Sequence, residues 1–124
     1  HRLVIVFDEF ADFMGRDKET SQKVSNLIQR LGQKGRASGI HLIICTQSPK
    51  ADIVPTNIRN NLQARLALKV TDSTASNIIL GEDGAELLAG KGDFFAKLQQ
   101  VLIRGKSPFL TSAVQKALIK YFRK

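Results

Sequence analysis

The feature that most constrains the fold is a short apolar run, Leu-Val-Ile-Val-Phe at residues 3–7, that ends in the adjacent acids Asp8 and Glu9. A continuous run of this length, rich in β-branched side chains, predicts a strand of a parallel sheet that is buried on both faces. The carboxyl ends of such strands are where α/β proteins bind their ligands. The run therefore predicts an α/β fold with two carboxylates at its functional edge.

Two acids at the end of a buried strand are typical of the Walker B motif of ATP-hydrolysing proteins. In that arrangement Asp8 would hold Mg²⁺, through water, and Glu9 would orient and deprotonate the attacking water. The alternative is that both acids are merely solvated where the strand ends. The run by itself does not separate these two interpretations.

Strand and helix patterns alternate along the rest of the chain, which predicts one α/β domain over residues 1–124. Thr111 is the expected cap of the last helix, and Asp72 or Ser73 that of the helix ending at Leu80. The expected helices cover residues 18–37, 56–62, 73–80, 85–88 and 111–122, the further strands residues 40–46 and 64–70, and a β-hairpin residues 93–104.

Composition points to a polyanionic partner. The chain carries 19 Lys and Arg against 11 Asp and Glu, a net charge of +8. Such an excess favours nucleic acid ahead of a membrane surface, the alternative being that it serves solubility. Cys45, the single cysteine, lies in an apolar run and is expected in the core. A reducing, cytoplasmic location fits, with no signal peptide or membrane segment seen. Because the sequence opens almost directly on a strand, we expect it to be cut from something longer.

Longer motifs carry a resemblance to a known family. Residues 6–14 read Val-Phe-Asp-Glu-Phe-Ala-Asp-Phe-Met, and residues 30–49 read Arg-Leu-Gly-Gln-Lys-Gly-Arg-Ala-Ser-Gly-Ile-His-Leu-Ile-Ile-Cys-Thr-Gln-Ser-Pro. Together with residues 57–62, 65–68, 84–88 and 90–93, they resemble the motor domain of the FtsK/SpoIIIE family of DNA translocases, in order and at similar spacing. The likeness covers nearly the whole chain and weakens after Arg104.

The resemblance implies a partial RecA-like, P-loop NTPase core: a mostly parallel sheet flanked by helices, with a carboxyl-terminal β-hairpin. It implies ATP and Mg²⁺ as cofactors, double-stranded DNA as partner, and a homo-oligomeric ring, usually a hexamer. The chain would be the carboxyl-terminal half of the motor domain, from Walker B onward. Its parent would act in the cytoplasm, at the inner face of the cell membrane if it is tethered there.

Residue roles follow from the same resemblance. Asp8 matches the metal-site acid and Glu9 the catalytic acid. Thr46 and Gln47 match a polar sensor pair that contacts the γ-phosphate or the attacking water. Arg65 matches an arginine finger that reaches the nucleotide of a neighbouring subunit. The alternatives are an ordinary polar residue leaving a strand for Gln47 and an arginine at a strand start for Arg65.

Two departures from the family pattern affect these expectations. Ser48 stands where the family usually has Arg, so a phosphate or DNA contact made by that arginine is missing. No Gly-x-x-x-x-Gly-Lys-Ser/Thr run occurs in the sequence. Residues 90–92, Gly-Lys-Gly, lack that spacing and are expected to form a turn. The chain alone is therefore expected neither to hold ATP tightly nor to hydrolyse it.

Three functional hypotheses remain. The first is part of an ATP-driven pump of double-stranded DNA, with Lys50 and Arg59 as candidate DNA contacts. The second is a related ring ATPase such as a conjugative coupling protein. The third is a non-enzymatic module that binds nucleic acid or another partner. Retention of the four candidate site residues Asp8, Glu9, Gln47 and Arg65 argues against the third.

The absent P-loop strand also has a structural consequence. In a RecA-like sheet it would lie between the strands at residues 40–46 and 64–70. We expect these two strands to pair directly or to pair with a second copy, in preference to the strand at 64–70 docking elsewhere. The strand at residues 3–7 is expected beside, and parallel to, residues 40–46.

Overall fold

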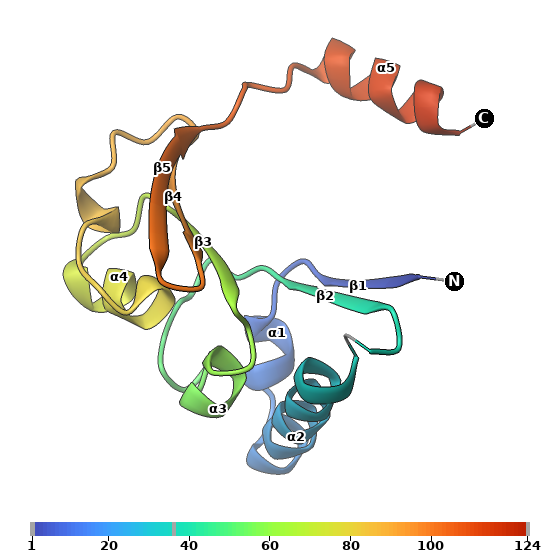
Figure 1. The fold of residues 1–124 in the computed structure, drawn as a ribbon, viewed down its shortest axis with the longest axis vertical. Helices are drawn as coiled ribbons and strands as arrows, with labels where there is room; N and C mark the ends of the chain where they lie inside the picture. The colour runs from blue at the N-terminus through green and yellow to red at the C-terminus, as the bar shows by residue number, and fades with distance from the viewer. Residues whose placement is uncertain (1, 36, 124) are drawn as a thin grey trace.

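The computed structural model describes residues 2–35 and 37–123 and arranges them around two separate sheets (Figure 1). The elements, in chain order, are β1 (Leu3–Phe7), α1 (Ala11–Met14), α2 (Lys18–Lys34), β2 (Ile40–Ile44), α3 (Thr56–Arg59), β3 (Ala64–Leu68), α4 (Ser73–Leu80), the 3₁₀ turn η1 (Ala85–Leu87), β4 (Asp93–Leu98), β5 (Val101–Lys106) and α5 (Ser112–Phe122).

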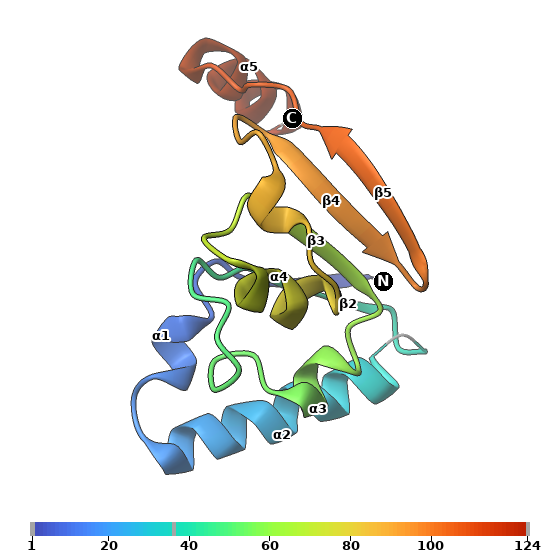
Figure 2. The same cartoon turned by 90° about the vertical axis from the view of Figure 1, so that its left-hand side faces the viewer.

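The first sheet is the parallel pair β1–β2, as predicted. Its register runs from Leu3 opposite Ile40 to Phe7 opposite Ile44. The crossover is made by α1 and α2, and α2 is capped by Asp17, whose carboxylate accepts the Thr20 N–H at 2.7 Å. Both helices lie on one side of the pair (Figure 2). The parallel crossover thus brings the carboxyl ends of both strands to one edge.

Only one face of the parallel pair is covered within the described residues, whereas the sequence predicted burial on both. Ile5 and Phe7 are half-buried toward α1 and α2, but Val4 and Val6 on the opposite face are more than half exposed. The expectation that Cys45 lies in the core is also wrong, because its side chain is exposed. The reason is the two-residue alternation of a strand, which turns every second side chain away from the single helical layer.

The second sheet is antiparallel, in the order β3–β4–β5. The predicted hairpin is confirmed as β4 and β5. The favoured direct pairing of the strands at residues 40–46 and 64–70 is wrong for this chain: β3 pairs with β4 instead, Ala64 opposite Leu98 and Leu68 opposite Phe94. The hairpin offers the backbone groups along one edge of β3 a partner at every residue from Ala64 to Leu68.

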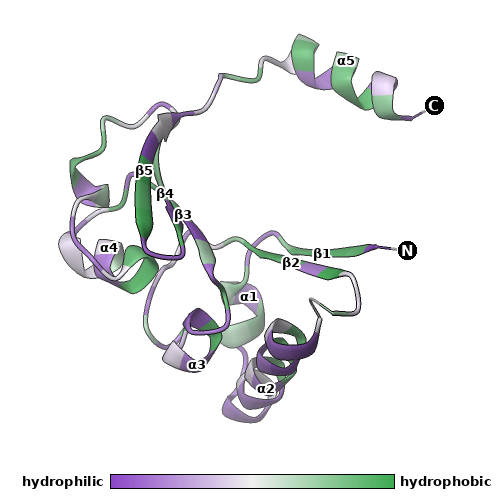
Figure 3. Cartoon of the chain, viewed as in Figure 1, coloured by the Kyte–Doolittle hydropathy of each residue, from purple (hydrophilic) through white to green (hydrophobic). Residues whose placement is uncertain are grey.

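One face of this second sheet is packed and the other is not. Ala67, Leu80, Ala85 and Leu88 form a buried cluster where α4 and η1 cover the inner face. The outer face is lined by apolar residues that are 46–61% exposed, namely Leu66, Leu68, Leu98, Val101 and Ile103. Most of β1 and β2 and one part of β5 are coloured as hydrophobic in Figure 3. Apolar surface is therefore exposed on both sheets.

The last helix, α5, stands away from both sheets at the end of an extended segment (Figures 1 and 2). Its predicted cap is confirmed, because the Thr111 hydroxyl accepts the Val114 N–H at 3.3 Å. Every residue of the helix is exposed. The accessible surface of the chain is 9324 Å², against about 6,600 Å² expected for a compact monomer of this length. No helix within the described residues is both long and apolar enough to span a membrane.

The Asp93 carboxylate joins the two strands of the hairpin through an ion pair with Arg104 and joins the hairpin to the preceding loop through the Ala89 N–H. Asp93 is buried and accepts Arg104 Nη2 at 2.8 Å, Arg104 Nε at 3.2 Å and the Ala89 N–H at 2.8 Å. The hydrogen bonds from Arg104, followed by that from Ala89, lower the pKa of Asp93 to about 2. The turn at residues 90–92, predicted in place of a phosphate cradle, precedes this pair; all three residues have positive φ.

This pair gives a pH-dependent prediction. A carboxyl whose pKa falls on folding stabilises the protein above its unfolded pKa, and that contribution is lost as the pH drops through the folded value. Between about pH 4 and pH 2, the melting temperature should therefore fall less in Asp93→Asn than in the parent chain. Asp52→Asn, an exposed loop carboxyl, is the control and should keep the parental slope. Equal slopes in all three proteins would contradict the assignment.

Candidate functional site

The two predicted acids and the predicted sensor pair meet at one edge of the parallel sheet. Backbone pairing continues past the strands, with Cys45 N–H donating to the Phe7 carbonyl and Phe10 N–H to the Cys45 carbonyl, both at 2.8 Å. This places Glu9 directly beside Thr46, although 37 residues separate them in sequence. Asp8, the neighbouring acid, is exposed at the same edge.

The Glu9 carboxylate is the centre of the site and accepts three hydrogen bonds. The Thr46 hydroxyl donates to Oε1 at 2.6 Å, and the Ala11 N–H donates to the same oxygen at 3.2 Å. The Gln47 N–H donates to Oε2 at 3.0 Å. The carboxylate is thus fixed from both strands, since one donor follows β1 and two follow β2.

These hydrogen bonds stabilise the ionised form of Glu9. They lower the pKa of its carboxyl, with the Thr46 hydroxyl as the largest cause and the Gln47 N–H as the second. Partial burial acts in the opposite direction but is outweighed. Glu9 is therefore ionised near neutral pH and presents an acceptor, as a group that receives a proton from water must.

Asp8 has the chemistry of a magnesium ligand but stands without a complete ligand set. Its exposed carboxylate offers the hard oxygen donors that Mg²⁺ prefers, and Mg²⁺ commonly keeps several waters while binding through one or two carboxylates. Within the described residues, no group of three or more His, Cys, Asp or Glu could hold a metal ion. The residues present thus fit a metal held by one acid, waters and substrate phosphates.

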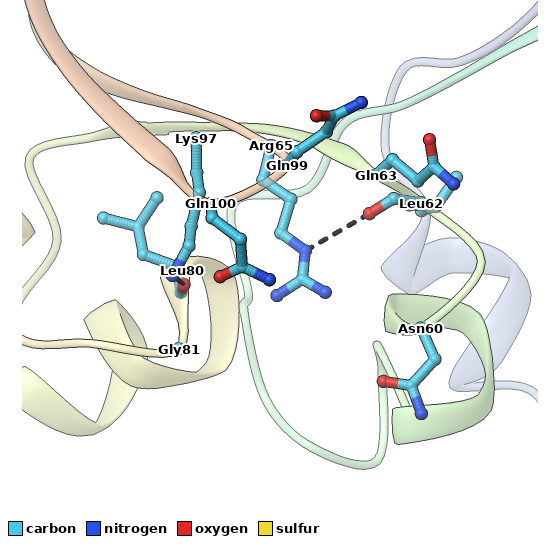
Figure 4. A pocket seen from close by; sticks show the side chains of 9 residues that line it. All are labelled: Asn60, Leu62, Gln63, Arg65, Leu80, Gly81, Lys97, Gln99 and Gln100. Atoms are coloured by element: carbon cyan, nitrogen blue, oxygen red, sulfur yellow. Dashed lines mark hydrogen bonds between the residues drawn. The ribbon is translucent and has the colours of Figure 1, made fainter.

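Arg65, the predicted arginine finger, extends from β3 toward the carboxyl ends of α3 and α4 (Figure 4). Its guanidinium donates to three backbone carbonyls: Nε to Leu62 at 3.3 Å, Nη1 to Ile79 at 3.3 Å and Nη2 to Arg59 at 2.8 Å. Burial lowers its pKa, and the nearby charge of Arg59 lowers it further. In this structure the guanidinium therefore connects three segments of its own chain.

Two further cations join Arg65 at the end of α4. Arg59 Nη1 donates to the Ile78 carbonyl at 3.4 Å, and Lys97 Nζ donates to the Leu80 carbonyl at 2.7 Å and to Glu82 at 2.7 Å. The carbonyls of Ile78, Ile79 and Leu80 thus each accept a hydrogen bond from a cationic side chain. The negative end of a helix dipole favours such an arrangement. Lys97 was not among the predicted site residues, and its position in a hairpin strand gave no signal for this role.

An open cleft of about 420 Å³ lies beside these cations. Figure 4 shows Arg65 and Lys97 among the amide side chains that line it, Asn60, Gln63, Gln99 and Gln100. Because both cations are already engaged by carbonyls, the cleft does not present a free guanidinium or ammonium group. It lies on the second sheet, separate from the edge that carries Glu9.

The two predicted DNA contacts differ in accessibility. Lys50 is exposed in the loop after β2. Arg59 is half-buried, donates through Nη2 to the Thr56 hydroxyl at 2.9 Å, and has a buried Nε without a hydrogen-bond partner among the described residues. Lys50 is thus free to meet a phosphate, whereas Arg59 is directed into the chain.

Comparisons with known proteins agree with this arrangement. The sequence model of the FtsK/SpoIIIE family matches residues 1–51. A DNA translocase FtsK of Leptospira interrogans is 42% identical over 98% of this chain, which spans only 13% of that protein. A DNA translocase FtsK of Staphylococcus epidermidis is 39% identical over 94% of the chain.

Solved structures share the fold. The conjugation coupling protein TcpA of pCW3, in a monomer form with ATPγS, is 31% identical, with a TM-score of 0.81 over 99% of this chain and 37% of that one. The cytoplasmic domain of the type VII secretion ATPase EccC from Thermomonospora curvata is 24% identical, with a TM-score of 0.76 over 90% of this chain and 12% of its own. The predicted P-loop ATPase fold is thereby confirmed.

The contacts of Arg65 predict a structural effect of its removal. Arg65→Ala leaves three carbonyls without their donor, and because the site is partly open to water we expect a loss of about 1–3 kcal/mol of unfolding free energy. Urea denaturation of the chain measures it. Arg30→Ala, which removes an exposed arginine of α2, should change stability by less than about 0.5 kcal/mol. Equal effects of the two substitutions would remove Arg65 from this structural role.

Proposed function

The chain belongs to the FtsK/SpoIIIE family, and we propose that it is the Walker B half of a motor that couples ATP hydrolysis to movement along double-stranded DNA. The observation that carries the proposal is the ionised Glu9 carboxylate, held by donors from two parallel strands beside the exposed Asp8. A carboxylate fixed at that edge fits the activation of a water molecule. Residues 1–124 would form the carboxyl-terminal half of the motor domain.

The residues at the carboxyl ends of β1 and β2 have separate roles in the proposed reaction. Asp8 would hold Mg²⁺, and the metal would supply positive charge to offset the charge that develops on the phosphates. Glu9 orients the attacking water and takes its proton. The side chain of Gln47, which is exposed beside Glu9, donates to a phosphate oxygen or accepts from the water. The solved structure of the similar protein TcpA contains ATPγS, which supports the proposal that this site binds a nucleotide.

Arg65 is proposed to act on the nucleotide of an adjacent subunit in a homo-oligomeric, hexameric ring. In the structure, the guanidinium donates to the carbonyls of Arg59, Leu62 and Ile79, so it must give up some of these hydrogen bonds to reach a nucleotide. The guanidinium would exchange one or more of these carbonyls for a phosphate oxygen when a neighbouring subunit docks. A charged acceptor binds a guanidinium more strongly than a neutral carbonyl does, which favours that exchange.

DNA is the proposed substrate for transport. The net charge of +8 suits a phosphate backbone, and two relatives of the chain are named DNA translocases. Lys50, exposed in the loop after β2, is the better of the two candidate contacts; Arg59 would first have to leave its partners within the chain. A motor that follows DNA of any sequence would contact phosphates and not base edges.

A second candidate function is that of a conjugative coupling protein. The likeness to TcpA, 31% identity at a TM-score of 0.81, is the observation that favours it. The ATPase chemistry at Asp8 and Glu9 would be the same, and the difference would lie in which DNA the motor serves. Loss of plasmid transfer, but not of chromosome segregation, on deleting the gene would select this candidate.

The catalytic role of Glu9 is tested in the full-length protein. Glu9→Gln keeps the side-chain volume but removes the proton acceptor, so ATP turnover should fall by about 10² to 10⁴-fold. Glu19→Gln, an exposed acid of α2 paired with Lys23, is the control and should retain parental turnover. The present chain, without a P-loop in its sequence, should show no turnover. Near-parental activity of Glu9→Gln would refute the assignment.

The DNA proposal predicts a characteristic salt dependence. Binding by the full-length protein should weaken at least about tenfold between 50 and 200 mM salt, equally for unrelated duplexes, because counterions are released from phosphates. Lys50→Gln should make the plot of log K against log salt less steep. Lys34→Gln, a change at an exposed lysine of α2, should leave the slope unchanged. Strong sequence preference in titrations by fluorescence anisotropy would count against the proposal.

A further inference from the structure

We propose that Thr46 acts on Glu9 and not on the nucleotide: it is a positioning residue that aims the proposed catalytic carboxylate through its hydroxyl group. The inference rests on the proposed function, because it assigns a role within that site. It differs from the role that the family resemblance implies for Thr46, a contact with the γ-phosphate or the attacking water. The hydrogen bonds around the hydroxyl separate the two roles.

The direction of the Thr46 hydroxyl proton is determined by its neighbours. The backbone N–H of Ser48 donates to Thr46 Oγ1 at 3.1 Å, so this oxygen acts as an acceptor on that side. Glu9 Oε1 lies 2.6 Å away on the other side, and an ionised carboxylate can only accept. The hydroxyl must therefore donate its one hydrogen bond to Glu9. The result is a relay from the Ser48 N–H through the Thr46 hydroxyl to the carboxylate.

Because the Thr46 hydroxyl donates to Glu9, it cannot donate to a γ-phosphate at the same time. Phosphate oxygens accept hydrogen bonds, so a hydroxyl that contacts a γ-phosphate oxygen must donate to it. The Thr46 hydroxyl can donate only one hydrogen bond, and it donates that bond to Glu9. Contact with the phosphate would cost the short bond to Glu9. The exposed side chain of Gln47, next along the chain, is free for that contact instead.

The relay also determines which part of Glu9 remains available. A carboxylate offers about four acceptor positions, two on each oxygen. On Oε1 they are taken by Thr46 and Ala11, and on Oε2 one is taken by the Gln47 N–H. One position on Oε2 stays open for the water. Without the Thr46 hydroxyl, Oε1 keeps only the longer bond from the Ala11 N–H, and the carboxylate is held less firmly about its terminal torsion, which is a soft one.

The donor to Thr46 is a backbone group, which makes the relay insensitive to the side chain at position 48. Ser48 departs from the arginine usual in the family, and the departure leaves the Ser48 N–H in place. Backbone pairing of Cys45 with Phe7 and Phe10 holds this segment against β1. The positioning of Glu9 therefore depends on backbone N–H groups and on one other side chain, that of Thr46.

The test uses steady-state ATPase kinetics of the full-length protein with two matched substitutions. Thr46→Val replaces the hydroxyl by a methyl group of nearly the same shape, and Thr46→Ser keeps the hydroxyl. We expect Thr46→Val to lower kcat at least about tenfold, because small misplacements of a catalytic group cost that much or more. The KM for ATP should change by less than about twofold, since ground-state binding is untouched. Thr46→Ser should restore kcat to within about threefold of the parent.

A double substitution identifies the residue through which Thr46 acts. If its effect passes through Glu9, then Thr46→Val combined with Glu9→Gln should be no slower than Glu9→Gln alone. A raised KM with unchanged kcat in Thr46→Val would show contact with the nucleotide and overturn the inference. So would a loss in Thr46→Ser equal to that in Thr46→Val, or additive losses in the double variant. Thermal melting of each variant shows whether the fold is kept.

Failure of the proposed function gives a different pattern. If the full-length protein hydrolyses no ATP, or if Glu9→Gln retains turnover, the site is not the proposed one and Thr46 has no catalytic residue to aim. If Glu9→Gln is inactive while Thr46→Val keeps parental kcat, the proposed function stands and this inference falls. In ¹⁵N spectra of the chain, the Gln47 and Ala11 amide signals should shift in Thr46→Val and stay near their parental positions in Thr46→Ser.

Discussion

The parallel pairing of β1 with β2 is the constraint on which the site depends. Its register, with Phe7 opposite Ile44, determines that the chain segments leaving both strands run side by side. Glu9 and Thr46 then meet at 2.6 Å without any adjustment of the strands themselves. A shift of one residue would reverse the face of every side chain that follows. The position of the carboxylate is thus a property of the ladder, and the core of Phe10, Ile28 and Ile58 beneath it maintains that ladder.

The sequence predicted this part of the molecule well, because the signals are local. An apolar β-branched run followed by two acids, a helix with an apolar stripe and a second apolar run together specify a βαβ unit. The cap at Thr111 and the hairpin at β4 and β5 were also found from short motifs, and of the two candidates Asp72 and Ser73 the structure selects Asp72 as the cap of α4. The sequence predicted that Glu9 and Thr46 lie at the same edge of the sheet. It did not predict which groups donate hydrogen bonds to the Glu9 carboxylate.

The sequence failed where the outcome depends on competition between distant partners. β3 could pair with β2 or with the hairpin, and both would satisfy its backbone groups. Residues 64–70 alternate large apolar side chains with charged or small ones, which is typical of an antiparallel strand but does not say which strand is the partner. The inward direction of Arg65 escaped prediction for a similar reason. It depends on the carbonyls of Ile79 and Leu62, which become acceptors only when α4 and the loop before β3 come together.

Helix α3 connects the two sheets, and this four-residue element sets the distance between the proposed functional groups. On one side Ile58 is fully buried against Phe10 and Ile28, and Asn57 Nδ2 donates to the Ser25 hydroxyl of α2 at 2.8 Å. On the other side Arg59 donates to the end of α4, and the Arg59 carbonyl receives Arg65. A movement of Arg65 toward a neighbouring subunit would therefore remove one of these two contacts, while the apolar side of α3 would stay packed against Phe10 and Ile28. Changes at Arg65 would thus act first on the junction of α3, α4 and β3, because within the described residues the guanidinium makes no hydrogen bond with the parallel ladder that holds Glu9.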